Sequence, residues 1–351
     1  MSRTRLRLRS AHVVVWSFLT LTLGVWPARP TLSSPLNLTT LVEDADFIVV
    51  GRVASTEQRE RTSLGPSEGS TPAWVTIVHL DVERVIKGNP EMPAVAFRMV
   101  VPVKGIGAEP TGYKDVSVGD FGVFFLRKAQ LGYEVLDPYH PFVPAAPGAP
   151  GGQGNCMDAV TEELEQVFRS QDKSVQSRSV RWEAVRALET VHTPKGTSAL
   201  KAASNDTDTL VRIWAVSALL GRNDISMLGQ VEDLVALPPD PHAVNLSSQL
   251  GMAIGRINNP RAVSLLARLL DCKDANIRRG AASALRNTRD SAAIKPLLKA
   301  LYDPDREVRY YAVVGLGEIT GQDEWTPSVA NFQQNEKLFL DHWREWAKAQ
   351  K

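Results

Sequence analysis

The residues with the potential for chemistry are few and scattered along the chain. None of the six histidines is followed by glutamate, and the sequence has no HExxH zinc motif, no GxSxG nucleophile elbow and no GxxxxGKS/T phosphate loop. Residues 104–107 (KGIG) supply only a G-x-G, which is typical of a turn between strands. We therefore expect no catalytic residues, no metal ligands and no cofactor. The histidines are His12, His79, His140, His192, His242 and His342.

Acidic residues and histidines in the first half of the chain leave an alternative open. Glu109, Asp115 and Asp120 would bind a cation if they gathered at one end of a barrel, although surface acids are usually only solvated. A pocket containing His79 or His140 would favour an enzyme, or a protein that binds a small ligand or a glycan, with its site in this region or where it meets the rest of the chain.

Composition excludes several classes of protein. The 351 residues are 43% hydrophobic, with 40 Lys and Arg against 39 Asp and Glu, so the chain is long enough for two or three domains with real cores and is not mainly disordered. A near-neutral chain lacks the clustered positive charge of general nucleic-acid binding. Cys156 and Cys272 are far apart and form no CxxC, which excludes a disulfide framework and gives no support for a redox role.

Residues 1–33 have the pattern of an export signal. Four arginines in residues 3–9 precede an apolar run of about 14 residues, at 13–26, which is short for a membrane span. Cleavage after Ser33 fits the preference for small residues better than cleavage after Ala28. An uncleaved anchor is the alternative. We expect the remainder to be extracytoplasmic, periplasmic or secreted, and to associate with a membrane only if the leader is retained.

Residues 41–137 have the pattern of strands. Alternation of Val78, Leu80 and Val82 with polar neighbours predicts a half-buried strand, and further strands are expected at residues 47–53, 94–101, 121–126 and 133–136. The polar stretch at residues 56–72 predicts a long loop. About five strands with glycine turns indicate a small antiparallel barrel or sandwich.

Residues 138–155 carry five prolines and four glycines. This composition predicts an extended connector without a core, which would leave the flanking domains loosely oriented. A helix is expected to begin near Met157, with apolar residues at helical spacing.

The remaining chain, residues 157–320, repeats itself. Five nine-residue segments begin with a branched or aliphatic residue, carry a small or apolar residue fifth and end on an aliphatic one, and their starts lie 31, 35, 31 and 31 residues apart. Two helices per period of this length predict an α-solenoid. The fold class is thus multidomain α and β, with a small β domain before the solenoid. The segments are residues 180–188, 211–219, 246–254, 277–285 and 308–316.

These segments resemble HEAT repeats, in particular the short HEAT-like form named after the phycobilisome lyases and grouped with armadillo-like proteins. DPDREVRYYAVVGL (residues 303–316) carries the resemblance most clearly. The third copy departs from the pattern, with Ser247 where the others have arginine. The resemblance implies a structural ladder, in which the aspartates cap helices and the arginines pair with a neighbouring repeat. Its members are Asp208, Asp274, Asp305, Arg181, Arg212, Arg278 and Arg309.

Two further resemblances extend this assignment. Residues 321–351 resemble the ends of exported bacterial HEAT-repeat proteins, where a tryptophan-containing helix closes the stack, here with Leu338, Phe339, Trp343 and Trp346. ADFIVVGRV, VERVIKG and VGDFGVFFL resemble more loosely an oligosaccharide-binding-fold or netrin-like module. Deoxyhypusine hydroxylases, which are HEAT-like enzymes, bind iron through His-Glu pairs that this chain lacks.

We expect a non-catalytic exported binding or scaffold protein whose solenoid surface binds an unknown protein partner. The arginine-rich helix with Arg278, Arg279, Arg286 and Arg289 would face either an acidic partner or solvent. The alternatives are an enzyme or a small-ligand or glycan-binding protein with its site in the β domain, and a membrane-anchored regulator of the cell envelope.

Overall fold

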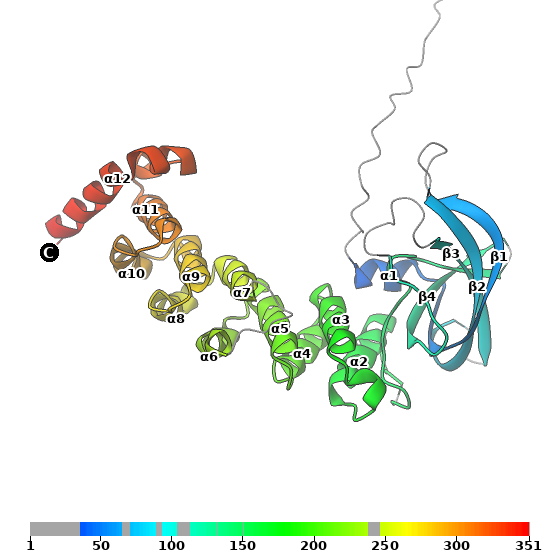
Figure 1. The fold of residues 1–351 in the computed structure, drawn as a ribbon. Helices are drawn as coiled ribbons and strands as arrows, with labels where there is room; N and C mark the ends of the chain where they lie inside the picture. Colours follow the sequence, from blue (N-terminus) through cyan, green and yellow to red (C-terminus); the bar gives the residue numbers. More distant parts are fainter. Residues whose placement is uncertain are drawn as a thin grey trace, which may run out of the picture.

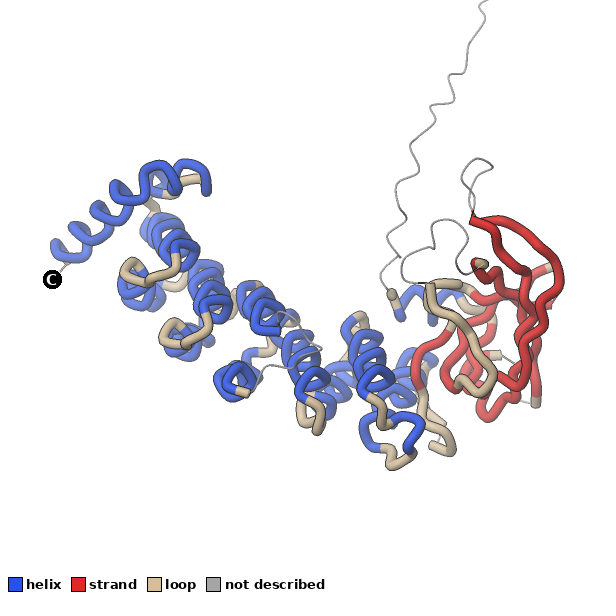
Figure 2. The backbone as a smooth tube through the Cα atoms, in the orientation of Figure 1, coloured by secondary structure: helices blue, strands red, loops and turns tan. Residues whose placement is uncertain are grey.

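The computed structural model describes residues 36–64, 71–88, 93–103, 113–130, 132–149, 151–237 and 246–350. A sheet-rich N-terminal part is followed by a long row of paired helices that ends at the C-terminal helix (Figure 1; Figure 2). The expected leader at residues 1–33 lies outside the described residues. Within the described ranges, no helix is long and apolar enough to cross a membrane.

Six strands form one sheet whose pairings return to the first strand. Strand β1 pairs with β2, β2 with β3, β3 in parallel with β5, β5 with β4, and β4 again with β1, while β6 pairs with β4. A short helix, α1 (Leu38–Asp44), precedes the sheet where no helix was expected. The strands are β1 (Phe47–Leu64), β2 (Thr71–Lys87), β3 (Ala94–Pro102), β4 (Phe121–Ala129), β5 (Gly132–Val135) and β6 (Phe142–Pro144).

Strands β1 and β4 are buried on both faces. Val49 and Phe124 belong to a core enclosed by the sheet. Their neighbours Ile48 and Phe125 point the other way, into a second core that continues through the helices. Because successive side chains of a strand alternate between faces, only a continuous apolar run can fill both cores. The sheet and the solenoid therefore share buried surface.

The prediction of a loop at residues 56–72 is wrong for most of that segment. Strand β1 continues to Leu64, and β2 starts at Thr71, with Gln58 paired to Thr76 and Thr62 to Ala73. This end of the hairpin extends past the core, so its side chains are mostly exposed. Polar residues suit a strand that is solvated on most of its surface, and composition alone does not distinguish such a strand from a loop.

The expected loose connector at residues 138–155 is also wrong. Residues 142–144 form β6, and Val143, Ala145 and Ala146 are at most 2% exposed. Proline is tolerated here because β6 is a three-residue strand that pairs with β4 only. The segment after β6 leads directly into the first solenoid helix, so it joins two parts that are packed together.

A buried ion pair fastens the sheet to the first long helix, α2 (Cys156–Arg169). The guanidinium of Arg84 on β2 donates to both carboxylate oxygens of Glu163, at 3.0 and 2.7 Å, and to the carbonyl oxygen of Ala146 at 3.2 Å. Glu163 is fully buried. A buried carboxylate is tolerated only when its oxygens are paired, and the two-fork geometry satisfies both.

The helices pack in two layers (Figure 1). The inner layer holds α3, α5, α7, α9 and α11 side by side, and each of the five sequence repeats falls within one of these helices. The other layer holds α2, α4, α6, α8 and α10. The bounds are α3 (Arg178–Glu189), α4 (Pro194–Ala203), α5 (Thr209–Gly221), α6 (Val231–Ala236), α7 (Leu246–Gly255), α8 (Val263–Leu269), α9 (Ala275–Thr288), α10 (Ile294–Ala300), α11 (Arg306–Thr320) and α12 (Val329–Ala349).

Short 3-10 turns precede several of these helices. Pro296 lies at the third residue of α10, after the turn Ser291–Ala293. Proline is accepted there because the first turn of a helix has no intrahelical acceptor for its missing N–H. The turns are Lys173–Val175, Ile225–Gln230, Pro260–Ala262, Ser291–Ala293 and Asp323–Trp325.

Small residues set the spacing of the inner helices. Ala184, Ala215, Ala281 and Ala312, each fifth in its repeat, have no exposed surface. Between α7 and α9 the approach is closer still, because a Cβ on Gly280 would lie 2.3 Å from the carbonyl oxygen of Gly251. Larger side chains at these positions would push the helices apart.

Helix α12 covers the end of the stack. Trp343 and Phe339 are buried and Trp346 is partly buried, as expected of a cap, but Leu338 is 57% exposed. At 3.6 residues per turn, position 338 lies about 100° around the helix axis from 339 and about 140° from 343, outside the buried face. Leu340 occupies the buried face instead. The His342 ring stacks on Trp325, with ring centres 3.5 Å apart.

The Arg84–Glu163 pair gives a first prediction. Arg84→Met should lower the free energy of unfolding by about 3 to 5 kcal/mol, because it leaves a buried carboxylate unpaired. The double variant Arg84→Met with Glu163→Leu should regain most of this loss, since no charge remains buried. Chemical denaturation measures both, and an additive double variant would contradict the pairing.

His342 gives a prediction for pH. Burial lowers the pKa of His342 below its ordinary 6.5, while Glu324 opposes the shift. The unfolded chain then binds the proton more readily, so this contribution to stability is complete above about pH 6.5 and decreases as the pH falls below it. In His342→Phe, the loss of melting temperature between pH 7.5 and pH 5 should be smaller than in the parent. His79→Gln, at an exposed position, should lose as much melting temperature over this pH range as the parent does.

Candidate functional site

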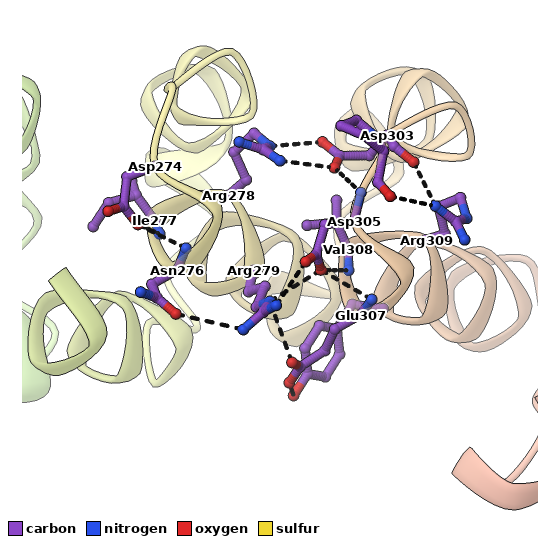
Figure 3. Close-up of polar contacts among 12 residues, drawn as sticks. Asp274, Asn276, Ile277, Arg278, Arg279, Asp303, Asp305, Glu307, Val308 and Arg309 are labelled. Atoms are coloured by element: carbon purple, nitrogen blue, oxygen red, sulfur yellow. Dashed lines mark hydrogen bonds and ion pairs between the residues drawn. The ribbon is translucent and has the colours of Figure 1, made fainter. Parts of the chain in front are cut away.

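The ladder aspartates are helix N-caps. Asp208, Asp274 and Asp305 precede α5, α9 and α11, and the side chain of each accepts hydrogen bonds from the two backbone N–H groups two and three residues on. For Asp305 the distances are 3.0 Å to Glu307 N and 3.2 Å to Val308 N (Figure 3). The first N–H groups of a helix have no intrahelical acceptor, which is why aspartate recurs here.

The ladder arginines connect successive repeats. Arg278 on α9 donates to both carboxylate oxygens of Asp303, at 2.8 and 3.1 Å (Figure 3). Arg309 on α11 donates to Glu336 on α12 at 2.6 Å. Arg181 lies 3.3 Å from Asp206 in the same relation. The carboxylates of Asp206 and Asp303 are nearly buried, so solvent screens these pairs only partly.

Arg278 and Arg309 also donate to backbone carbonyl oxygens in the loop that precedes their own helix. One Nη of Arg278 donates to the carbonyl oxygens of residues 272 and 273, at 3.0 Å each, and Arg309 donates to those of residues 303 and 304. The planar, five-donor guanidinium reaches a carboxylate and two carbonyls at once, which lysine does not match.

A second set of pairs, which the sequence analysis missed, involves the caps themselves. Arg279 donates to both oxygens of Asp305, at 3.0 and 2.6 Å, and Arg178 donates to Asp208 at 2.7 Å. The hydrogen bond from Arg279 lowers the pKa of Asp305 below its ordinary value. Arg181 and Arg278 bind the aspartate two residues before the cap, and the D-x-D spacing at residues 206–208 and 303–305 was the available signal in the sequence.

The ladder is interrupted around α7. Ser247 replaces the arginine, and Cys272 stands where Asp206 and Asp303 stand in the other repeats, 25 residues after the ladder position. A hydrogen bond of 3.0 Å from Asn276 to Ser247 joins the helices instead. Arg212 donates to Thr209 of its own helix at 3.3 Å, and its Nε has no partner among the described residues.

The arginine-rich helix α9 does not present a free basic face. Arg278 and Arg279 bind the aspartates of the next repeat, and Arg286 donates to both oxygens of Glu318 at 2.8 and 2.5 Å. Arg289 is the left-handed residue that ends the helix. Docking of an acidic partner on this helix would have to compete with these internal carboxylates.

Among the described residues, the candidates of the sheet region do not gather into a metal site. Asp120 closes a turn by accepting from Ser117 N at 2.8 Å, His79 lies exposed on β2, and His140 pairs with Asp137 at 2.9 Å. Glu109 lies outside the described residues. Across the described ranges, no three His, Cys, Asp or Glu residues are placed to hold a metal ion. Cys156 and Cys272 are both half-buried free thiols.

A groove lies beside α7 on the inner layer of helices. It consists of a cavity of about 450 Å³ toward α9 and α11 and another of about 230 Å³ toward α3 and α5, which share Met252 and Arg256. Met252 is 58% exposed between them. We refer to these two adjoining cavities as the α7 groove. Gln249, Asn276 and Tyr311 supply further polar groups along it.

Comparison with known proteins bears on the repeats. Residues 239–317 match the family model of HEAT repeats. The match spans α7 to α11 and includes the residues that line the larger of the two cavities of the α7 groove. No curated protein matches the chain.

Solved structures with similar segments include designed and natural repeat proteins. An engineered protein is 24% identical, covering 47% of this chain and 83% of its own with a TM-score of 0.32. A designed armadillo repeat protein is 20% identical over 52% of this chain and 89% of its own, at 0.32. Human deoxyhypusine hydroxylase, in complex with glycerol, is 20% identical over 54% of this chain and 76% of its own, at 0.23. TM-scores this low do not indicate a shared global arrangement.

The double role of Asp305 can be tested by substitution. Asp305→Ala removes an N-cap and the partner of Arg279, and should lower the free energy of unfolding by about 1 to 2 kcal/mol. Asp305→Asn keeps a cap acceptor and should cost less. Asp271→Ala is the control, because its pair with Lys299 is about two-thirds exposed and should contribute less than about 0.5 kcal/mol. Equal effects of Asp305→Ala and Asp271→Ala in denaturant titrations would contradict the structural role.

Proposed function

We propose that this chain is a non-catalytic interaction scaffold whose solenoid binds a protein partner along the α7 groove. The observation that supports it is the exposed Met252 between two adjoining cavities, on the stretch that matches HEAT repeats. Methionine adapts its shape to different apolar surfaces and is frequent in protein-binding grooves. The ion pairs of the ladder hold the flanking helices in register, so the groove is preformed.

The composition of the groove favours an extended peptide segment. The two cavities together extend along the inner layer from α3 to α11. Each is lined by amide or hydroxyl groups that can form hydrogen bonds with a peptide backbone, such as those of Gln249 and Asn276. Arg256 is exposed, lines both cavities and forms no ion pair with a described residue. An acidic side chain of the partner would complement it.

Two finer assignments belong to the same proposal. The repeat interval of 31 residues supports the short HEAT-like type named after the phycobilisome lyases. The strands pair in the order β1, β2, β3, β5 and β4, and β4 pairs again with β1, as in a closed barrel. This closure, with β3 and β5 parallel, supports an oligosaccharide-binding-fold-like barrel at the N-terminus.

Export is proposed from the leader. Residues 1–33 combine a basic start with a short apolar run, and would direct the chain out of the cytoplasm as a cleaved signal or retain it as an anchor. Cell fractionation with N-terminal sequencing of the recovered chain distinguishes these outcomes. Recovery of the intact leader in the soluble cytoplasmic fraction would contradict both.

The α7 groove can be tested with a matched pair of positions. Met252 and Leu338 are 58% and 57% exposed, on the groove and on the cap respectively. A photo-crosslinking amino acid at 252 should capture a specific protein from intact cells, while the same residue at 338 should not.

The affinity of the captured protein then provides the decisive measurement. Met252→Asp should weaken its binding at least tenfold, about 1.4 kcal/mol, and Leu338→Asp should leave it unchanged. Unchanged binding by the folded Met252→Asp variant would place the partner elsewhere on the chain.

A further inference from the structure

A cavity of about 370 Å³ lies where the sheet region meets α3. Residues 113, 114, 139, 140 and 142–144 of the sheet region line one side, and Trp182, Glu183 and Arg186 of α3 line the other. We refer to it as the junction cavity. It is separate from the α7 groove, and its size and position at an interface between two parts of the chain are typical of a small-molecule site.

Four aromatic residues, Tyr113, Tyr139, Phe142 and Trp182, contribute to its walls. Tyr113 and Tyr139 meet edge to face with ring centres 5.8 Å apart, and Trp182 meets Trp214 in the same way at 6.0 Å. Phe142 is 8% exposed, with the ammonium of Lys114 3.8 Å from its ring centre. Rings fixed in this way offer flat apolar surfaces against which a planar ligand can pack.

Two cations border the same space, and they differ in their partners. The ammonium of Lys114 lies 2.6 Å from the carboxylate of Glu183, across the junction. The guanidinium of Arg186 lies 5.2 Å from the Trp182 ring centre and 6.0 Å from that of Trp214, and it forms no ion pair with a described residue. Its faces contact rings, while the donors at its edge remain available for a carboxylate.

We propose that the junction cavity binds a small aromatic carboxylate. The aromatic ring of the ligand packs against Tyr139 and Trp182, and its carboxylate binds the edge of Arg186. Lys114 is held by Glu183 and contributes less while that pair is intact. Because the lining comes from both parts of the chain, the ligand also stabilises their junction. This site does not depend on the protein partner of the α7 groove.

The test uses the full chain with phenylacetate and cinnamate as probes, and cinnamyl alcohol as the uncharged analogue. Calorimetry or ligand-observed NMR should show the carboxylates binding at least ten times more tightly than the alcohol. Arg186→Gln should abolish this preference. Arg261→Gln alters an exposed arginine far along the solenoid that forms no ion pair with a described residue, and this variant should preserve the preference.

A second variant separates this effect from misfolding, because it should increase affinity. Glu183→Gln releases Lys114, and the affinity for cinnamate should rise threefold or more. The proposal is overturned if neither carboxylate binds, if the alcohol binds equally well, or if Arg186→Gln has no effect. Preferential binding of glucuronate over phenylacetate would overturn the aromatic part, because it would assign the site to sugar acids.

Discussion

The solenoid depends on carboxylates placed at the starts of its inner helices. A helix begins with backbone N–H groups that need acceptors, and an aspartate cap supplies them locally. In this chain the cap Asp305 also binds Arg279 of the preceding inner helix, and Asp303, two residues earlier, binds Arg278. Thus one short D-x-D segment ends a loop, starts a helix and fixes its position against the previous repeat. Helix formation and repeat stacking share the same side chains.

The sheet and the solenoid are joined by a different principle. Strands β1 and β4 fill two cores at once, and the core on the outer side of the sheet continues into α2 and α3. Apolar contact of this kind is not directional, whereas the Arg84–Glu163 pair requires one particular geometry. Together they make the junction a defined part of the structure, with a cavity whose lining comes from both sides.

Features with a local cause could be predicted from the sequence. The five repeats lie in five inner helices, and the cap positions follow from the chemistry of aspartate at a helix start. Features that depend on distant partners could not. Nothing in the Pro/Gly-rich composition of residues 138–155 indicates that Val143 is buried against helices, and nothing near Arg84 in the sequence points to Glu163, 79 residues away. Leu338 was assigned to the cap by residue type, although helical periodicity places it toward solvent. The pairing of Arg279 with Asp305 could have been predicted from the sequence, because the D-x-D spacing recurs in two repeats.

The interruption of the ladder at α7 divides the solenoid into segments that respond differently to solution conditions. In a repeat array, each repeat is stabilised only by contacts with its nearest neighbours. On either side of α7 the repeats are joined by ion pairs, which weaken when carboxylates are protonated or ions accumulate around their exposed members. The contact between Gly251 and Gly280 carries no charge and is insensitive to both. Acid or high salt therefore loosens the stacking of α5 on α3 and of α11 on α9, while α7 stays packed against α9. Under these conditions the array no longer unfolds as one cooperative unit.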